Sequence, residues 1–311
     1  MPGDPVATRA SLPGVTNLTR APSPGSAPTV QRRADGSGLL DALRAAHRGA
    51  PALTALAPEG YARDHAAFEA LSDQRTLIAA HLTSRLAARA TGPVAVLSVG
   101  CGDGSLDAQV ALAAVDVVPE RAVRYVGVDP YVGSTTAWTG AMAALGRASL
   151  SAEPLVATFA AAPITGSFDV VTFVHSMYYV PDVAVALRAA YDLLEPGGEL
   201  LVLSGPRGVL NALTDVLAPP VAGHRQWFSE DVAEALVEAG LAAEPTVTLA
   251  ARLDLAGASD RVLDFTVQGR LTPQLRPLVR EYLAAVARTD PAYDGPRVPH
   301  PVDVHRVVRA A

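Results

Sequence analysis

The sequence predicts an α/β fold in which helices cover a doubly wound, mostly parallel sheet. The first observation is that short apolar runs, typical of strands buried on both faces, alternate with longer stretches typical of helices. The second is a glycine-rich turn at 100–104, directly after the first of these runs. Strands that alternate with helices form parallel sheets with right-handed crossovers, and no internal repeat interrupts this order.

The chain of 311 residues is long enough for one large core with an appended cap, because half of its residues are apolar. The longest apolar runs are too short to cross a bilayer, and no basic segment leads into an apolar N-terminal stretch. A cytoplasmic protein with no membrane partner is therefore expected. The single cysteine, Cys101, excludes an internal disulfide and a multi-thiolate metal site.

Charge excludes further classes of function. The net charge is −6, and no basic run with interleaved aromatic residues is present to follow a phosphate backbone, so nucleic acid is not an expected partner. The sequence contains no lysine, which excludes pyridoxal phosphate chemistry, Schiff-base chemistry and a phosphate-loop lysine. The expected partner is a small molecule, and the oligomeric state stays open.

The N-terminal part divides into a tail and a helical segment. Residues 1–38 are rich in Pro, Gly, Ser and Ala and have no apolar periodicity, which predicts a disordered tail. Over 39–90 the apolar spacing predicts a short helix, then one long helix or two broken ones from Tyr61 to Ala90. This segment precedes the first strand and is predicted to form a lid.

The core is predicted over 91–251, followed by a helical insertion and a C-terminal strand over 252–311. The expected strands are 94–99, 123–128, 155–159, 168–174 and 199–204. The expected helices are 105–115, 137–148, 182–194 and 207–217. A helix that Ser229 caps and Gly240 ends leads into a strand near 245–250. Residues 252–290 are predicted to be helical, and 303–309 to be the last strand.

The run VAVLSVGCGDGSLD at 94–107 is a buried strand that breaks into Gly100, Gly102 and Gly104 before a helix. Glycines there let the backbone turn sharply and approach a ligand closely. A nicotinamide-type fingerprint would have a third glycine where this chain has Ser105, so the spacing favours a nucleoside without a pyrophosphate. The alternative is a turn that binds nothing.

The second strand, VRYVGVDP, ends in Asp129, where a carboxylate can accept both ribose hydroxyl protons of a bound nucleoside. An aspartate followed by proline is also a good start for a helix, and the two roles can coexist. Only the binding role also explains the glycine turn. Asp129 is therefore assigned to the cofactor site, together with Pro130 and Ser134, which follow it.

At these residues the chain resembles the Rossmann-like S-adenosylmethionine-dependent methyltransferases, over roughly 91–250. The strand FDVVTFVHSMYYV at 168–180 and the segment LLEPGGELLVLSG at 193–205 follow in the order and spacing of that superfamily. The resemblance implies S-adenosylmethionine as cofactor, with the three glycines under its methionine portion and Asp129 on its ribose. It also implies that Thr158 lies near the adenine and that Val174 and His175 flank the cofactor.

Within this superfamily the chain looks most like histamine N-methyltransferase and its bacterial relatives. The supporting stretches are YARDHAAFEALSDQ at 61–74, HSMYYVPD at 175–182 and WFSEDVAEALVEAGL at 227–241. The resemblance implies an aromatic substrate pocket, which suits a flat ring and stabilises positive charge. The residues that it implies for this pocket are Tyr61, Phe68, Tyr178 and Tyr179.

The resemblance also implies roles for two polar residues. It places His300 near a substrate-binding asparagine, and Gln74 where the family carries an acidic residue. A glutamine cannot supply the charge that pairs with an ammonium group, so a neutral or anionic substrate is expected in place of histamine.

His175 is the expected general base, grouped with Tyr178 and Tyr179 as catalytic, because an unperturbed histidine has a pKa near 6.5. The alternative for His175 is a histidine that is hydrogen-bonded at the rim of the sheet.

The reaction predicted from the sequence is in-line attack of a substrate nitrogen on the sulfonium methyl, in a setting of specialised metabolism. Such a reaction needs alignment and exclusion of water more than strong acid or base assistance. The first alternative is a small-molecule O-methyltransferase that acts on a hydroxyl or carboxyl group. A non-catalytic nucleoside-binding module and a nucleotide-linked oxidoreductase are further alternatives. No metal site is predicted.

Overall fold

The computed structural model describes residues 36–57, 60–89, 92–117, 121–220 and 223–310. The predicted tail lies outside these ranges up to residue 35, and residues 36–38 begin the first helix, α1 (Gly36–Arg48). The other α-helices described are α2 (Tyr61–Glu69), α3 (Gln74–Ala88), α4 (Ser105–Val117), α5 (Val132–Ala144), α6 (Val183–Asp192), α7 (Leu210–Leu217), α8 (Ser229–Glu238), α9 (Asp260–Thr266) and α10 (Leu275–Val286). The segment from Tyr61 thus forms two helices.

The main sheet has seven strands in the order β4-β3-β2-β5-β6-β12-β7. Their bounds are β2 (Val94–Val99), β3 (Val123–Asp129), β4 (Leu150–Val156), β5 (Phe168–Val174), β6 (Leu194–Ser204), β7 (Val247–Leu249) and β12 (Val302–Val308). Strands β4, β3, β2, β5 and β6 run parallel to one another, whereas β12 pairs antiparallel with β6 and β7. The predicted mostly parallel, Rossmann-like sheet is confirmed.

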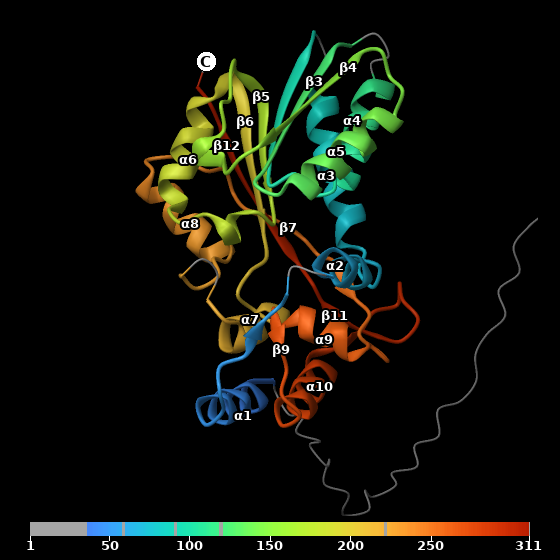
Figure 1. The fold of residues 1–311 in the computed structure, drawn as a ribbon, viewed down its shortest axis with the longest axis vertical. Coiled ribbons are helices and arrows are strands. Elements are labelled where there is room, and N and C mark those ends of the chain that lie inside the picture. The colour runs from blue at the N-terminus through green and yellow to red at the C-terminus, as the bar shows by residue number, and fades with distance from the viewer. Residues whose placement is uncertain (1–35, 58–59, 90–91, 118–120, 221–222, 311) are drawn as a thin grey trace, which may run out of the picture. The chain divides into compact units, whose positions relative to one another are not determined.

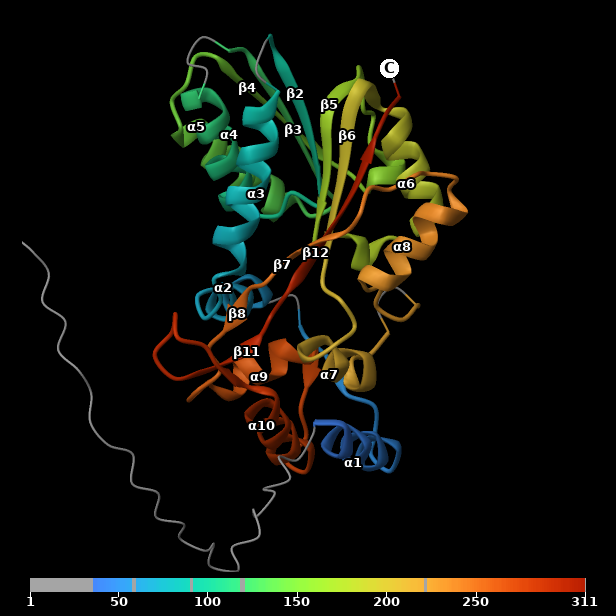
Figure 2. The ribbon, with the colours of Figure 1, turned by 180° about the vertical axis from the view of Figure 1, so that it is seen from behind.

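Helices cover both faces of this sheet (Figures 1 and 2). On one face α3, α4 and α5 enclose a core that includes Ile78, Val110 and Trp138. On the other face α6 and α8 pack through Leu187 and Leu236. The central strands are buried on both sides by these layers, which explains why their sequences are almost continuously apolar. No helix among the described residues is both long enough and apolar enough to cross a membrane.

A third core lies in the helical part, where α1, α7, α9 and α10 pack together near α2 (Figure 1). The predicted insertion before the last strand is present, but it is not wholly helical. It contains α9 and α10 and also the short strands β8 (Arg252–Leu253), β9 (Gly269–Arg270), β10 (Arg288–Thr289) and β11 (Pro296–Pro299). Strand β9 pairs with β1 (Thr54–Ala55), and β11 pairs with β8 and β10.

Two predicted elements have shifted bounds. The strand expected at 155–159 runs from Leu150 to Val156, because β4 is an exposed edge strand that shows no apolar run. Its Pro154 suits an edge, since proline lacks an N–H for a further strand. The helix expected at 137–148 starts at Val132 and ends at Ala144, just before Gly146 with its positive φ.

The predicted cap of α8 was wrong. The backbone N–H of Phe228 bonds to the carboxylate of Asp231 at 2.7 Å, so Phe228 occupies the cap position and Asp231 closes the first turn. The Ser229 hydroxyl instead donates to Asp303 at 2.7 Å and lies 2.8 Å from Nε2 of His305. The Ser229 side chain is thus bonded to β12, whose residues are more than 70 positions away along the chain and could not be foreseen from the local sequence.

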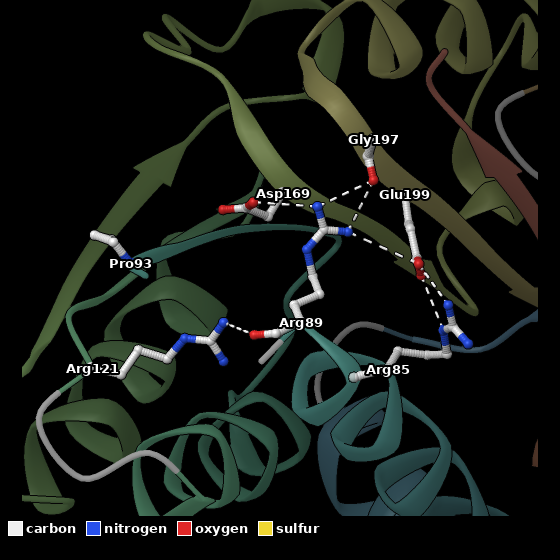
Figure 3. A pocket seen from close by; sticks show the side chains of 8 residues that line it. Arg85, Arg89, Pro93, Arg121, Asp169, Gly197 and Glu199 are labelled. Carbon is white, nitrogen blue, oxygen red and sulfur yellow. Dashed lines mark hydrogen bonds and ion pairs between the residues drawn. The ribbon is translucent and has the colours of Figure 1, made fainter. Parts of the chain in front are cut away.

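At the amino ends of the parallel strands, away from the glycine turn, lies a shallow pocket of about 350 Å³ (Figure 3). One of its lining residues is Glu199, 5% exposed, which accepts two hydrogen bonds from Arg85 at 3.0 and 2.6 Å and one from Arg306 at 2.8 Å. Nearby, Arg121 donates to the carbonyl of Leu86 and so satisfies the C-terminal end of α3. These contacts join α3 to β6 and β12.

We expect Glu199→Gln to lower the free energy of unfolding by roughly 2–4 kcal/mol at pH 7, because it leaves a partly buried arginine cluster without its carboxylate. Burial by itself raises the pKa of the Glu199 carboxyl, but Arg85 and Arg306 lower it overall. The stabilisation is therefore complete above the pKa of the unfolded chain and is lost as pH falls through the lower folded pKa. Denaturant unfolding at several pH values measures this loss.

The matched control is Glu153→Gln, which removes a pair with Arg124 at 3.4 Å whose carboxylate is 50% exposed. It should change stability by less than about 0.5 kcal/mol. Equal effects of the two substitutions would show that the Glu199 cluster adds nothing beyond a surface ion pair.

Candidate active site

The glycine turn follows β2, and its three glycines have different surroundings. Gly100, Gly102 and Gly104 all have positive φ, of 73°, 57° and 78°. A Cβ at Gly100 would lie 2.3 Å from Cβ of Ser176, and one at Gly104 would lie 2.7 Å from the backbone of Trp138. Nothing lies within 4 Å of the corresponding point at Gly102. Packing therefore requires the first and third glycines, and the second leaves the backbone open to a ligand.

Asp129, at the end of β3, is buried and holds the turn from the side. Its carboxylate accepts the backbone N–H of Gly102 at 3.2 Å and that of Tyr131 at 2.9 Å. Asp129 is not the helix cap that the Asp-Pro pair suggested, because Tyr131 is the N-cap of α5. The Asp129 carboxylate joins the glycine turn to this cap residue and still has lone pairs for hydroxyl donors. Pro130 is exposed beside it, and Ser134 is half-buried in the first turn of α5.

Exposed apolar side chains follow the same edge of the sheet. Tyr131 and Val132 follow β3 and are 69% and 68% exposed, Val156 ends β4 at 56%, and Tyr179 follows β5 at 51%. Large apolar groups left in water beside a polar site suit a flat heteroaromatic ligand. Thr158, expected near the adenine, is also exposed just beyond β4.

A buried carboxylate that the sequence interpretation missed supports the turn from below. Asp107, in the first turn of α4, accepts hydrogen bonds from Ser98 at 3.1 Å, Tyr125 at 3.1 Å and Trp138 at 2.8 Å. Burial raises the pKa of Asp107 to about 6. An acid in the first turn of a mostly apolar helix was the available signal, and its three partners come from different elements.

A polar atom without a hydrogen-bond partner among the described residues lies beside the turn. Ser176 Oγ, next to Gly100, is buried and has no hydrogen-bond partner among the described residues. Buried hydroxyls are normally bonded, so this atom indicates a polar group that approaches the turn. The open backbone at Gly102, the Asp129 carboxylate and this hydroxyl together fit the polar portions of S-adenosylmethionine.

His175 lies at the end of β5 with both ring nitrogens engaged. Its backbone φ is 51°, a strained value for a residue with a side chain. Nδ1 lies 2.9 Å from the hydroxyl of Tyr178, and Nε2 lies 2.8 Å from Oε1 of Gln74. The pKa of His175 is lowered to about 3 by burial and by His300, His65 and Arg75, so the ring is neutral.

The donors and acceptors around His175 form a directed chain. The amide nitrogen of Gln74 donates to the backbone carbonyl of His300 at 2.8 Å, so the amide oxygen faces His175. His175 must then donate from Nε2 and accept at Nδ1 from the Tyr178 hydroxyl. The Tyr178 oxygen in turn accepts the N–H of Gly205 at 3.2 Å. We call these four contacts the Gln74–His175 chain.

Three of the four aromatic residues of the predicted pocket, Tyr61, Phe68 and Tyr179, belong to one cluster. Phe265, which sequence reasoning missed, joins two of them. Phe265 of α9 lies 5.3 Å from Tyr61 and 5.1 Å from Phe68, measured between ring centroids. Phe68 meets the ring of His300 edge-on at 5.4 Å. The hydroxyls of Tyr61 and Tyr179 are 3.2 Å apart and so link α2 to the end of β5. Phe265 lies in the insertion, where no motif marked it.

Most of the predicted site residues therefore belong to two groups, within each of which the residues are in contact. The glycine turn and Asp129 form one, and the Gln74–His175 chain with the aromatic cluster forms the other. Val174 is half-buried beside the core at the end of β5. Burial raises the pKa of Tyr178 and Tyr179. Burial also raises the pKa of Cys101, which agrees with a packing role for that thiol.

Comparison with known proteins identifies the family. A family model described as a methyltransferase domain matches residues 71–245. The chain belongs to this methyltransferase family. S-adenosylmethionine is accordingly its cofactor, as the sequence predicted, and the predicted methyltransferase fold is confirmed.

Curated relatives match this methyltransferase over part of their length. The ubiquinone biosynthesis O-methyltransferase of Xanthomonas oryzae pv. oryzae is 34% identical over 114 residues, which cover 34% of this chain and 41% of the relative. The protein of the same name from Ralstonia nicotianae is 32% identical over 145 residues, which cover 40% and 56%. These relatives give no support to the finer resemblance to histamine N-methyltransferases.

Two solved structures resemble the methyltransferase in fold. A Bacillus halodurans C-125 protein with a provisional methyltransferase name has a TM-score of 0.51 and 18% identity, over 74% of this chain and 99% of its own. The YcgJ protein from Bacillus subtilis has a TM-score of 0.50 and 16% identity, over 74% and 99%. At such identities the likeness concerns the fold alone.

We expect Asp129→Asn to weaken binding of S-adenosylmethionine by about 1.5–3 kcal/mol, because an amide cannot accept from both backbone donors and the ligand. Titration calorimetry measures the affinity. The matched control is Asp169→Asn, since Asp169 also accepts a backbone N–H, from Ala95 at 2.8 Å, at the amino ends of the strands. If both variants bind the cofactor as the wild type does, Asp129 has only a structural role.

A Gln74→Glu substitution should destabilise the fold by roughly 2–4 kcal/mol at neutral pH, because a carboxylate oxygen would face the His300 carbonyl in a buried site. The new charge should also raise the pKa of His175 from its low value. Denaturant unfolding and NMR titration of the ring measure the two effects. The control is Gln109→Glu, at an exposed position of α4. Unchanged stability together with new turnover of basic amines would restore Gln74 as a substrate-binding residue.

Proposed function

We propose that this methyltransferase transfers a methyl group to the hydroxyl oxygen of a small aromatic molecule. The observation that carries the proposal is that both polar atoms of the Gln74 amide are already bonded: its nitrogen donates to the carbonyl of His300, and its oxygen accepts from His175. The position at which relatives of the resembled subfamily hold a cation is therefore neutral and already bonded. The neighbouring Tyr61 and Tyr178 are neutral as well, because burial raises the pKa of both hydroxyls.

The charged groups nearby also oppose a cationic substrate. Glu69 bonds to Arg75 and lies 3.3 Å from His65, and Arg75 lies 3.8 Å from Asp103. The carboxylate of Asp73 accepts the N–H of Arg252 at 2.7 Å and the hydroxyl of Tyr293. Each of these carboxylates is thus bonded within the protein, and an ammonium group would have to displace an existing partner.

The names of the relatives support the same acceptor. The similar proteins from Xanthomonas oryzae pv. oryzae and Ralstonia nicotianae are both called O-methyltransferases. This favours the hydroxyl alternative over the nitrogen acceptor that was the first prediction from the sequence. A cytoplasmic location and a place in specialised metabolism remain predictions within this proposal.

When bound, the cofactor supplies an electrophilic methyl group on a sulfonium. In the proposed reaction Asp129 and the open backbone at Gly102 hold the nucleoside and methionine portions. The ring of Tyr61, half-buried against Phe265, would offer an aromatic surface to a flat acceptor ring. Catalysis then consists chiefly of aligning the acceptor oxygen with the methyl carbon and excluding water from the contact.

A methyl-transfer screen that reads product mass tests this proposal. Catechol, a simple phenol, benzoic acid and histamine would be compared with the wild-type protein and S-adenosylmethionine. We expect methylated catechol or phenol, little reaction of histamine, and the same activity in the presence of a chelator. Efficient methylation of histamine would overturn the hydroxyl assignment, and activity that requires added magnesium would overturn the metal-free reaction.

A further inference from the structure

We propose that Nε2 of His300 accepts the hydroxyl proton of the acceptor during methyl transfer. This inference rests on the proposed function, because it concerns a hydroxyl substrate at the same site. It assigns to His300 the role of general base that the sequence assigned to His175.

Both ring nitrogens of His175 are engaged in hydrogen bonds. Its Nε2–H is bonded to the amide oxygen of Gln74, and its Nδ1 accepts from the hydroxyl of Tyr178. A substrate proton could reach this ring only if one of these bonds broke. Within the Gln74–His175 chain, His175 therefore acts as a spacer that positions Gln74 and Tyr178.

The tautomer of His300 follows from the hydrogen bonds of Ser72. Ser72 Oγ accepts the backbone N–H of Gln74 at 3.1 Å, and its one proton can go to the carbonyl of Arg252 at 3.0 Å or to Nδ1 of His300 at 2.9 Å. Because the carbonyl can only accept whereas Nδ1 can also donate, we assign the proton to the carbonyl and make Nδ1 the donor, which satisfies all three contacts. A neutral imidazole protonated at Nδ1 carries its lone pair on Nε2. No hydrogen bond joins Nε2 to any residue in the part of the chain that the structure describes.

The backbone of His300 is held in place on both sides. His300 lies in the short connection between β11 and β12, where its backbone N–H donates to the carbonyl of Ala251 at 2.9 Å. Its carbonyl accepts from Gln74, so the backbone is held on both sides. The ring is only partly buried and meets the edge of Phe68 in the aromatic cluster. A hydroxyl group that approaches beside Phe68 would meet Nε2 of His300, which is the one ring nitrogen of the two histidines without a hydrogen-bond partner among the described residues.

The chemistry of the step balances. His300 Nε2 takes the proton as the substrate oxygen bonds to the methyl carbon, and the carbon–sulfur bond breaks with its electron pair going to sulfur. The positive charge of the sulfonium thus ends on the His300 imidazolium, which returns the proton to water after the products leave. Burial lowers the pKa of free His300 to about 4, despite the opposing effect of Asp73, so the ring is a neutral acceptor at neutral pH.

The test compares His300→Asn with the wild type on two phenols at neutral pH. One is phenol itself, which keeps its proton, and the other is a nitrophenol that is largely ionised. We expect the turnover of phenol to fall about 100-fold or more, as for loss of a general base, and that of the nitrophenolate to fall far less. Added imidazole should restore part of the activity of His300→Ala toward phenol. Affinity for S-adenosylmethionine should stay within twofold in both variants.

The matched control is His81→Asn, at a histidine of α3 that lies outside both groups of site residues, and its activity on both phenols should equal that of the wild type. Equal losses on the two phenols, or full activity of His300→Asn, would overturn the role of His300 alone. A wild type that methylates neither phenol would contradict the proposed function and this inference with it.

NMR of histidine-labelled wild type gives a readout that does not depend on how the variants fold. The ring of His300 should be protonated at Nδ1 in the neutral form, and that of His175 at Nε2. Protonation of His300 at Nε2 would overturn the proposal.

Discussion

The orientation of the buried Gln74 amide determines which groups donate and which accept along the Gln74–His175 chain. Because the backbone carbonyl of His300 can only accept, Gln74 must direct its amide nitrogen there and its oxygen toward His175. That choice determines the tautomer of His175 and makes the Tyr178 hydroxyl a donor. One hydrogen-bond assignment thus links the start of α3, the ends of β5 and β6, and the connection between β11 and β12.

The chain of bonds also explains why the two halves of the site have different chemistry. At the edge of the parallel strands, the Asp129 carboxylate accepts two backbone N–H groups and keeps lone pairs for further donors, an arrangement suited to a polar cofactor. At the helical part, the Gln74–His175 chain consists of neutral groups that bond one another beside largely buried aromatic rings. Under the proposed function, this chain offers no free carboxylate to a bound cation.

Two structural supports keep these halves together, and both lie outside the residues that motifs identify. Asp107 accepts hydrogen bonds from Ser98, Tyr125 and Trp138, and so ties the helix that follows the glycine turn to β2, β3 and α5. At the opposite end of the strands, Glu199 and its arginines attach α3 to the sheet, which positions Gln74 at the other end of the same helix. The strain at His175, with its φ of 51°, is tolerated because both ring nitrogens are bonded.

The sequence by itself determined the sheet and the cofactor edge, because these depend on local patterns. The apolar runs of β2 and β5 define strands buried on both faces, and the glycines and Asp129 are adjacent to the strands that position them. The bounds of the edge strand β4 were predicted wrongly, because its exposed residues follow no apolar pattern. Only the tertiary structure decided the hydrogen-bond partners of Gln74, His175 and His300. Their hydrogen bonds join positions more than a hundred residues apart, and a donor or acceptor role depends on the partner that folding brings to it.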